Sequence, residues 1–291
     1  MRVKIWGARG SIPAPGPETM RYGGNTSCVE VTLSDGSTLI LDAGTGIRNL
    51  GLAMGDVHEP LNILLTHLHL DHIQGLMFFA PAFRRQCEIT VWGPDAGEGS
   101  LCERIARYIS APLAPVDVRE LPLTFQAAGP GEWRIGSATI RAELVTHRGP
   151  TLGYRIEDAG SSLCYIPDHE PGVGTPLSEL SAEWIPGLEL ARDASLLIHD
   201  CQYTDAEYES HVGWGHCSLT DALIFARRAQ ARRVMMFHHD PMHSDDFLDA
   251  FCGRLVDRWS ELGGRPEQVE LAAERREIVV SEPAAQAAAA S

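Results

Sequence analysis

The chain has 291 residues, of which 44% are hydrophobic and 22% charged, a globular balance that allows a full core to be buried. Its formal net charge is −15, from 24 basic and 39 acidic residues, and it has no basic stripe. This charge argues against long nucleic acids and anionic membranes as partners. A small phosphate ester remains compatible, because bound metal ions would supply positive charge locally.

The sequence shows no clear pattern of a membrane span, a signal peptide or a disulfide framework. The apolar runs are far shorter than the ~20 residues that a membrane span needs. The first residues, "MRVKIWGARGSIPAPGP", reach charge and proline too early for a signal peptide. The seven cysteines are scattered, odd in number and form no C-x-x-C pair, which is typical of reduced core residues. We therefore expect a cytoplasmic protein without a membrane segment.

The first half of the chain predicts mainly strands. Apolar or alternating runs bounded by turn residues cover residues 2–7, 28–33, 37–44 and 61–67. Residues 98–112 fit a helix that Pro112 and Pro115 would end.

Strands and then helices follow in the second half. Strand-like runs cover residues 133–147, 152–158, 161–168 and 194–200. Two helices are predicted, from Ser218 with Asp221 in capping-box spacing, and from Ser244 to Gly263, with a buried strand within 232–240 between them. Residues 281–291 are a low-complexity, Ala-rich tail that we expect to be disordered. Without an internal linker or repeat, residues 1–280 are expected to form one layered α/β domain.

The stretch "LLTHLHLDHIQG" places four metal-binding side chains in six positions. In extended chain, His67 and His69 point the same way, whereas Asp71 and His72 follow a turn and point to a neighbouring place. Imidazoles and carboxylates are the normal ligands of Zn²⁺ and similar divalent ions. Four of them are more than one tetrahedral ion normally takes from so short a segment, which favours two ions over a solvated His-rich turn.

The segment "THLHLDH" resembles the H-x-H-x-D-H signature of the metallo-β-lactamase superfamily, and this resemblance implies a four-layer αββα sandwich. The later ligands of that family have counterparts in the expected order, each at the end of an apolar run. His147 ends "ELVTH", Asp168 ends "LCYIPD", and His238 or His239 ends "VMMFHH". The resemblance covers about residues 1–280.

The resemblance also implies how the ligands divide. His67, His69 and His147 would hold one ion, and Asp71, His72 and His238 the other, with Asp168 as the bridge; His239 is the alternative to His238. Two ions ~3.5–4 Å apart can share a hydroxide that forms near neutral pH and attacks the substrate. Asp71 therefore counts as both a ligand and a catalytic residue. Zn²⁺ is expected first, and Mn²⁺ or Fe²⁺ also suit this donor set.

Two further segments resemble the ribonuclease Z and cyclic-phosphate phosphodiesterase branch. "GNTSCVEVTLSDGSTLILDAGTG" contains Asp42 where the family has an aspartate that braces the metal loops, although a plain turn aspartate would look the same. "GWGHCSLTDALIFARRA" matches a G-H-S-(S/T) segment whose histidine protonates the leaving oxygen. That residue is His216, with Cys217 where serine is commoner, and a histidine that merely precedes a helix is the alternative.

We therefore expect a binuclear metal-dependent hydrolase, a phosphodiesterase of small or cyclic phosphodiesters with His216 as general acid. A ribonuclease Z acting on tRNA is the nearest alternative, but the segment between His72 and His147 shows no basic, Gly/Pro-rich arm. A lactone, thioester or β-lactam hydrolase could use the same metals without an acid at His216. An iron-dependent redox member would carry a second domain, and a non-enzymatic metal-binding scaffold is the remaining alternative.

Several residues near the motifs are candidates for the walls of the cleft. They are Arg9, Asn25, His169, Tyr203 and Trp214. Four other histidines are expected to be surface or turn residues without a role: His58, His199, His211 and His243.

Overall fold

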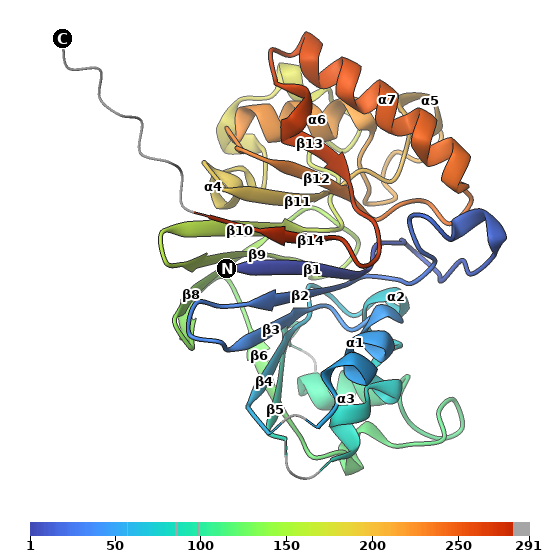
Figure 1. The fold of residues 1–291 in the computed structure, drawn as a ribbon, viewed down its shortest axis with the longest axis vertical. Helices are drawn as coiled ribbons and strands as arrows, with labels where there is room; N and C mark the ends of the chain where they lie inside the picture. Colours follow the sequence, from blue (N-terminus) through green and yellow to red (C-terminus); the bar gives the residue numbers. More distant parts are fainter. Residues whose placement is uncertain (57, 85–86, 98, 282–291) are drawn as a thin grey trace.

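A computed structural model describes residues 1–56, 58–84, 87–97 and 99–281. Two seven-stranded mixed sheets form its centre (Figure 1). The first sheet has the order β14-β1-β2-β3-β4-β5-β6 and is parallel from β3 to β6. Its strands are β1 (Arg2–Gly7), β2 (Cys28–Thr32), β3 (Thr38–Leu41), β4 (Leu61–Leu64), β5 (Ile89–Pro94), β6 (Leu123–Ala128) and β14 (Glu277–Val279).

The second sheet has the order β13-β12-β11-β10-β9-β8-β7 and is parallel from β10 to β13. Its antiparallel part is the meander from β7 to β10. The strands are β7 (Gly131–Ile135), β8 (Ala138–Leu144), β9 (Leu152–Asp158), β10 (Ser161–Ile166), β11 (Leu196–Asp200), β12 (Val234–Phe237) and β13 (Val269–Leu271).

Helices cover the outer face of each sheet (Figure 1). On the first sheet these are α1 (Gly46–Met54), α2 (Leu70–Ile73) and α3 (Leu101–Ala106). The helices of the second half are α4 (Leu188–Ala191), α5 (Asp205–Tyr208), α6 (Leu219–Arg228) and α7 (Asp245–Glu261). Short 3-10 turns occupy Pro17–Thr19, Leu76–Phe78, Ala80–Phe83, Val118–Glu120, Leu177–Glu179, Ala182–Trp184 and Pro266–Gln268. The expected αββα sandwich is thereby confirmed.

Three apolar layers follow from this arrangement. In β11, Ile198 faces the other sheet and Leu197 faces the helices, and both are fully buried. A parallel strand that is covered on both faces must be apolar throughout, which explains the continuous runs in the sequence. Where such a strand ends, its next residues reach the rim of the sandwich, and polar side chains there can converge.

Some predicted elements have other boundaries. Of the helix expected over 98–112, the described residues form only α3, which Ser100 caps. The chain leaves the helical path where the Ile109 carbonyl accepts from Val118 N, and the Ser110 hydroxyl donates to the Ala106 carbonyl at 2.5 Å. The run 133–147 is a hairpin that turns at Gly136, whose φ is 54°. Strands β5 and β6 and helix α1 were not predicted from the sequence.

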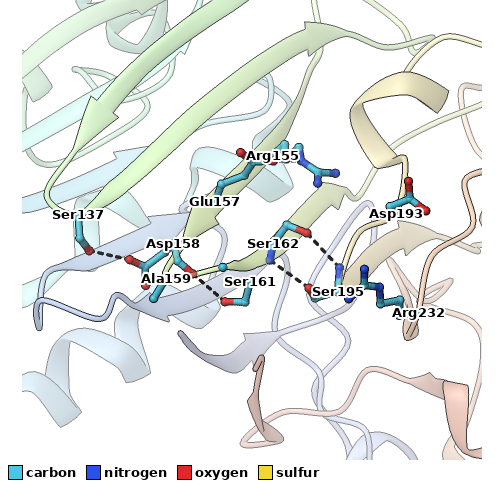
Figure 2. A pocket seen from close by; sticks show the side chains of 11 residues that line it. Ser137, Arg155, Glu157, Asp158, Ala159, Ser161, Ser162, Asp193, Ser195 and Arg232 are labelled. Carbon is cyan, nitrogen blue, oxygen red and sulfur yellow. Dashed lines mark hydrogen bonds and ion pairs between the residues drawn. The ribbon is translucent and has the colours of Figure 1, made fainter. Parts of the chain in front are cut away.

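The Ala-rich tail lies outside the described residues, apart from Ser281. Among the described helices, none combines the length and the apolar character that spanning a bilayer requires. Figure 2 shows a polar surface pocket between the β9–β10 turn and Ser195, lined also by Arg155 and Arg232. It lies at the start of β10 and β11, the opposite end of the sheet from the histidine cluster described below.

Candidate metal centre

The histidine-rich segment begins where β4 stops pairing. The strand ends at Leu64, and residues 65–69 continue as extended loop until α2 begins at Leu70. This places His67 and His69 on the loop and Asp71 and His72 in the first turn of the helix, as the alternating pattern and the turn predicted. His67 and His72 are buried and His69 is exposed, so the cluster opens to solvent on the side of His69.

One group of ligand atoms combines this loop with the end of β8. His67, His69 and His147 offer nitrogen atoms that all lie within 4.8 Å of one another. His69 Nδ1 is 3.2 Å from His147 Nε2. Three imidazoles so close together, two of them at least partly buried, can hold one cation.

A second, fully buried group is formed by Asp71, His72, Asp168 and His238. Asp71 Oδ2 is 3.3 Å from His72 Nε2 and 3.2 Å from His238 Nε2. Asp168 follows β10 and His238 follows β12, and both strands run parallel to β11 between them, which brings the two residues to the same rim.

Asp168 reaches both groups. Its Oδ2 atom is 3.7 Å from both His67 Nε2 and His147 Nε2, and 3.3 Å from His238 Nε2. Its Oδ1 atom is 3.1 Å from His72 Nε2. The carboxylate therefore occupies the position that the bridging role requires.

The choice between the two adjacent histidines follows from backbone geometry. His238 has a φ of 62°, which turns its side chain into the cluster, whereas His239 Nε2 donates to the Ala272 carbonyl at 2.8 Å. His238 belongs to the cluster, and His239 ties β12 to the C-terminal segment.

Asp42 braces the loop. It is fully buried at the end of β3, accepts from Thr66 N at 2.7 Å and from the Tyr165 hydroxyl at 2.9 Å, and accepts His72 Nδ1 at 2.8 Å. A donated Nδ1–H fixes the tautomer, so that His72 Nε2 presents its lone pair to the centre.

His147 and His238 are oriented in the same way by other groups. His147 Nδ1 donates to the Gly215 carbonyl at 2.7 Å, and His238 Nδ1 donates to Gln202 Oε1 at 2.9 Å. A Cβ on Gly215 would lie 2.3 Å from His147 Nδ1, and one on Gly10 would lie 2.3 Å from His238 Nδ1. Both glycines are therefore required by the close approach of backbone to a ring.

The side chains fit a divalent metal. Among the described residues, the buried His67 Nε2 atom has no hydrogen-bond partner. Burial lowers the pKa of His67 well below its ordinary value, which keeps the ring neutral. Burial would also lower the pKa of His72, but Asp168 and Asp71 raise it well above the ordinary value. The carboxylates thus favour positive charge at a place surrounded by inward-facing nitrogens, which suits a divalent cation.

His216 stands beside both groups. Its ring centroid is 5.0 Å from that of His147 and 4.8 Å from that of His238, and its Nδ1 donates to Asp200 Oδ2 at 2.7 Å. Burial would lower the pKa of His216, but Asp200 raises it above the ordinary value. The paired imidazole can therefore carry a proton next to the centre.

The candidates for the cleft wall lie in different environments. Arg9 is fully buried and donates to the carbonyls of Gly23, Asp240 and His243, so it links backbone segments and does not face a cleft. Asn25 bonds Glu274, and Tyr203 is buried. Trp214 is 54% exposed beside Gly215, and the half-buried Asn25 lines a separate surface pocket.

The histidines expected at the surface are partly internal. His199 is fully buried in β11 and its Nε2 lies 3.0 Å from Nδ1 of the equally buried His169, while His243 is buried and pairs with Glu207. The prediction was wrong for His199 because a histidine in a fully covered strand can bond another internal group. His211 is half-buried, and His58 lies on the surface.

Three functional neighbours were missed from the sequence: Asp200, Gln202 and Glu170. Asp200 ends the run "ASLLIHD" at a strand end just as Asp168 does, and that parallel could have indicated it. Gln202 and Glu170 lie two residues beyond such aspartates, and the sequence carries no signal for them.

Two stacked sheets with a His/Asp cluster at their rim define a hydrolase of the metallo-β-lactamase fold. The model of the β-lactamase superfamily domain matches residues 37–239, and the chain belongs to this superfamily, whose members bind divalent metal ions at such a cluster. A ribonuclease Z of Kineococcus radiotolerans is 26% identical over 79% of this chain and 82% of its own.

Solved structures show the same fold. A diphosphatase of the PhnP family has a TM-score of 0.68 at 16% identity, covering 97% of this chain and 98% of that chain. The metallo-β-lactamase fold protein YhfI of Bacillus subtilis has a TM-score of 0.67 at 19% identity, covering 96% of this chain and 99% of that chain.

Proposed function

We propose that the protein is a binuclear phosphodiesterase of small or cyclic phosphodiesters. The observation that carries this proposal is the pair His216–Asp200 beside the metal cluster. Ligand atoms of His147, Asp168 and His216 lie within 4.8 Å of one another. A proton donor at that place serves a reaction in which a poor leaving group departs from a centre held by the metals, as in cleavage of an alkyl phosphodiester.

We assign His67, His69 and His147 to one ion, Asp71, His72 and His238 to the other, and Asp168 to both. Zn²⁺ is the first choice for the imidazole-rich donor set. When bound, the ions supply charge stabilisation for the phosphoryl oxygens and an activated water. The chain itself orients the ligands through Asp42, Gln202 and the Gly215 carbonyl, and holds a proton on His216.

Two features favour a small substrate over tRNA. The formal charge of −15 opposes a long polyanion. The segment between His72 and His147 shows no basic, Gly/Pro-rich arm that could grip a tRNA. Ribonuclease Z activity remains the second candidate, because the Kineococcus relative bears that name.

The test is the loss caused by His216→Ala on two substrates with different leaving groups. An alkoxide leaving from a ribose needs a proton, whereas p-nitrophenolate hardly does. We expect kcat/KM to fall on the order of 10²–10⁴-fold on a cyclic nucleotide or alkyl diester, and far less on bis(p-nitrophenyl) phosphate. His58→Ala, at an exposed histidine outside the cluster, is the matched control and should show no such difference.

The competing functions give other results. Equal losses on both substrates would mean that His216 supports binding or structure and would contradict the general-acid role. Efficient turnover of a lactone or thioester, with no loss in His216→Ala, would replace the phosphodiesterase proposal. Cleavage of a tRNA precursor faster than of any small diester would favour ribonuclease Z.

A further inference from the structure

Two buried carboxylates hold the loop that carries His216: Asp200 accepts from His216 Nδ1 and Cys217 N, and Glu170 binds the part of the loop before His216. Glu170 is 2% exposed and comes two residues after Asp168. Its Oε1 atom accepts from Gly213 N at 2.7 Å and from the Tyr208 hydroxyl at 2.8 Å, and its Oε2 atom accepts from Gly215 N at 2.7 Å. Three donors of one loop thus converge on a single side chain.

The same residue is fixed to the rest of the site through its backbone. Glu170 N donates to the Thr146 carbonyl at 2.8 Å, directly before His147. Glu170 therefore joins three parts of the site: the end of β10, the segment after β8, and the loop from Tyr208 to His216. Its place in the fold gives it no contact with the ligand atoms themselves.

The loop depends on an external partner, because its own backbone is irregular. Gly213 and Gly215 have φ values of 81° and 95°, in the left-handed region, and regular structure resumes only at α6, which begins at Leu219. The Gly215 amide that binds Glu170 directly precedes His216. An amide anchored next to the histidine limits how far the ring can move from the metal groups.

We infer that Glu170 is a positioning residue that holds the His216 loop in the geometry needed for proton donation. This inference rests on the proposed function. A misplacement of about 1 Å at a reacting group can cost on the order of 10²-fold in rate. A glutamine is the sharpest substitution, because its amide keeps one acceptor oxygen and turns an NH₂ donor toward a backbone N–H.

The experiment compares Glu170→Gln with the wild-type enzyme on the two substrates used for His216, with metal content measured on every sample. We expect kcat on the alkyl or cyclic diester to fall on the order of ten- to a hundredfold. On bis(p-nitrophenyl) phosphate we expect a change of less than about threefold, with KM for both substrates and metal content retained. Amides 213 and 215 should exchange hydrogen faster.

Tyr208→Phe is the matched variant, since it removes one of the three bonds to Glu170, together with the bond from Gly174 N, and keeps the carboxylate. It should show a smaller loss that again affects the alkyl diester more. If Glu170→Gln fails to fold, this variant alone decides, and equal losses on the two substrates would overturn the inference.

The two proposals fail in different ways. If His216→Ala discriminates between the leaving groups but Glu170→Gln and Tyr208→Phe do not, the positioning role is wrong and the proposed function stands. Loss of metal in Glu170→Gln would likewise overturn the positioning role. If His216→Ala itself does not discriminate, the proposed function fails, and the role of Glu170 in proton donation fails with it.

Discussion

Asp168 has the most constrained position of any residue in the site. Burial alone would raise its pKa, but His238 and His72 lower it well below the ordinary value, so the side chain is a carboxylate that faces four imidazoles. A carboxylate in such surroundings serves to hold cations. For the stability of the fold alone, an apolar side chain would be at least as favourable.

Removing that carboxylate should release metal without unfolding the protein. In Asp168→Ala we expect less than half of the wild-type metal and no measurable turnover, with an unchanged far-UV spectrum, because a core of this size does not need metal to fold. Elemental analysis and circular dichroism measure the two effects. Asp158→Asn is the control: this buried aspartate bonds Ser34 at the far end of the sheet, and its loss should leave metal intact. Full metal in Asp168→Ala would contradict the bridging assignment.

Asp42, in contrast to Asp168, should contribute mainly to the stability of the fold. Its removal would leave the Thr66 amide, the Tyr165 hydroxyl and His72 Nδ1 without their shared acceptor. We expect Asp42→Ala to lower the free energy of unfolding of the metal-free protein by about 3 kcal/mol. Urea unfolding measures this loss, and Tyr165→Phe, which deletes only one bond, should lose about 1 kcal/mol. Equal stability of Asp42→Ala and the wild type would show that Asp42 is a plain turn residue.

At the level of elements, the site is built from the ends of strands. β4, β8, β10 and β12 each deliver ligands just past their last paired residue, and short loops hold these ligands at fixed distances. The loop before α6 is the exception, because it lies on no strand and reaches the cluster through its backbone. We therefore expect Gly215 of this loop to tolerate substitution as poorly as the ligands do.

Gly215→Ala tests this expectation. The new Cβ would lie 2.3 Å from His147 Nδ1, so the ring or the loop must move, and we expect metal affinity to fall on the order of ten- to a hundredfold. Competition with a chelator of known affinity measures the change. Gly213→Ala is a matched control, because it has a similar φ of 81° but no heavy atom within 4 Å of the added Cβ. Equal effects of the two variants would attribute the loss to backbone strain alone.

The strand-end ligands could be predicted because the resemblance to the metallo-β-lactamase superfamily indicated which residue types to expect, and apolar runs showed where the strands before them end. The runs alone indicated a layered α/β domain, and the resemblance implied the αββα sandwich. The short α3 could not be predicted, because the chain after it bonds to Val118 and not onward along the helix, and neither could the burial of Arg9, two of whose partners lie more than 230 positions away in sequence. Gln202 and Glu170 likewise act through contacts that only the folded chain creates.

At the scale of the whole molecule, the cluster joins the two sheets. His67 to His72 come from the first sheet, and His147, Asp168 and His238 come from the second. A cation held by both halves binds the native state and not the unfolded chain, so it must stabilise the sandwich as a unit.

Removal of metal should therefore lower Tm while leaving secondary structure intact. At a free ion concentration of 100 times Kd, one bound ion contributes about 2.7 kcal/mol, which corresponds to a shift of several degrees in a chain of this size. Thermal unfolding with and without EDTA measures it, and readdition of Zn²⁺ should restore the original Tm. Asp168→Ala should show little shift on the same treatment. An unchanged Tm after complete metal removal would mean that the ions do not bridge the sheets.

Contacts between early and late segments of the chain determine which parts of the fold can form while the chain is still being translated. β1 pairs with β14, and Arg9 bonds the carbonyls of Asp240 and His243. Asp71 and His238 are 167 positions apart, so a ribosome that adds about 5–20 residues per second finishes the second cation group roughly ten to thirty seconds after its first ligand is translated. Until then the "HLHLDH" segment exists without its partners. The second group of ligands can therefore assemble only after β12 and His238 have been translated.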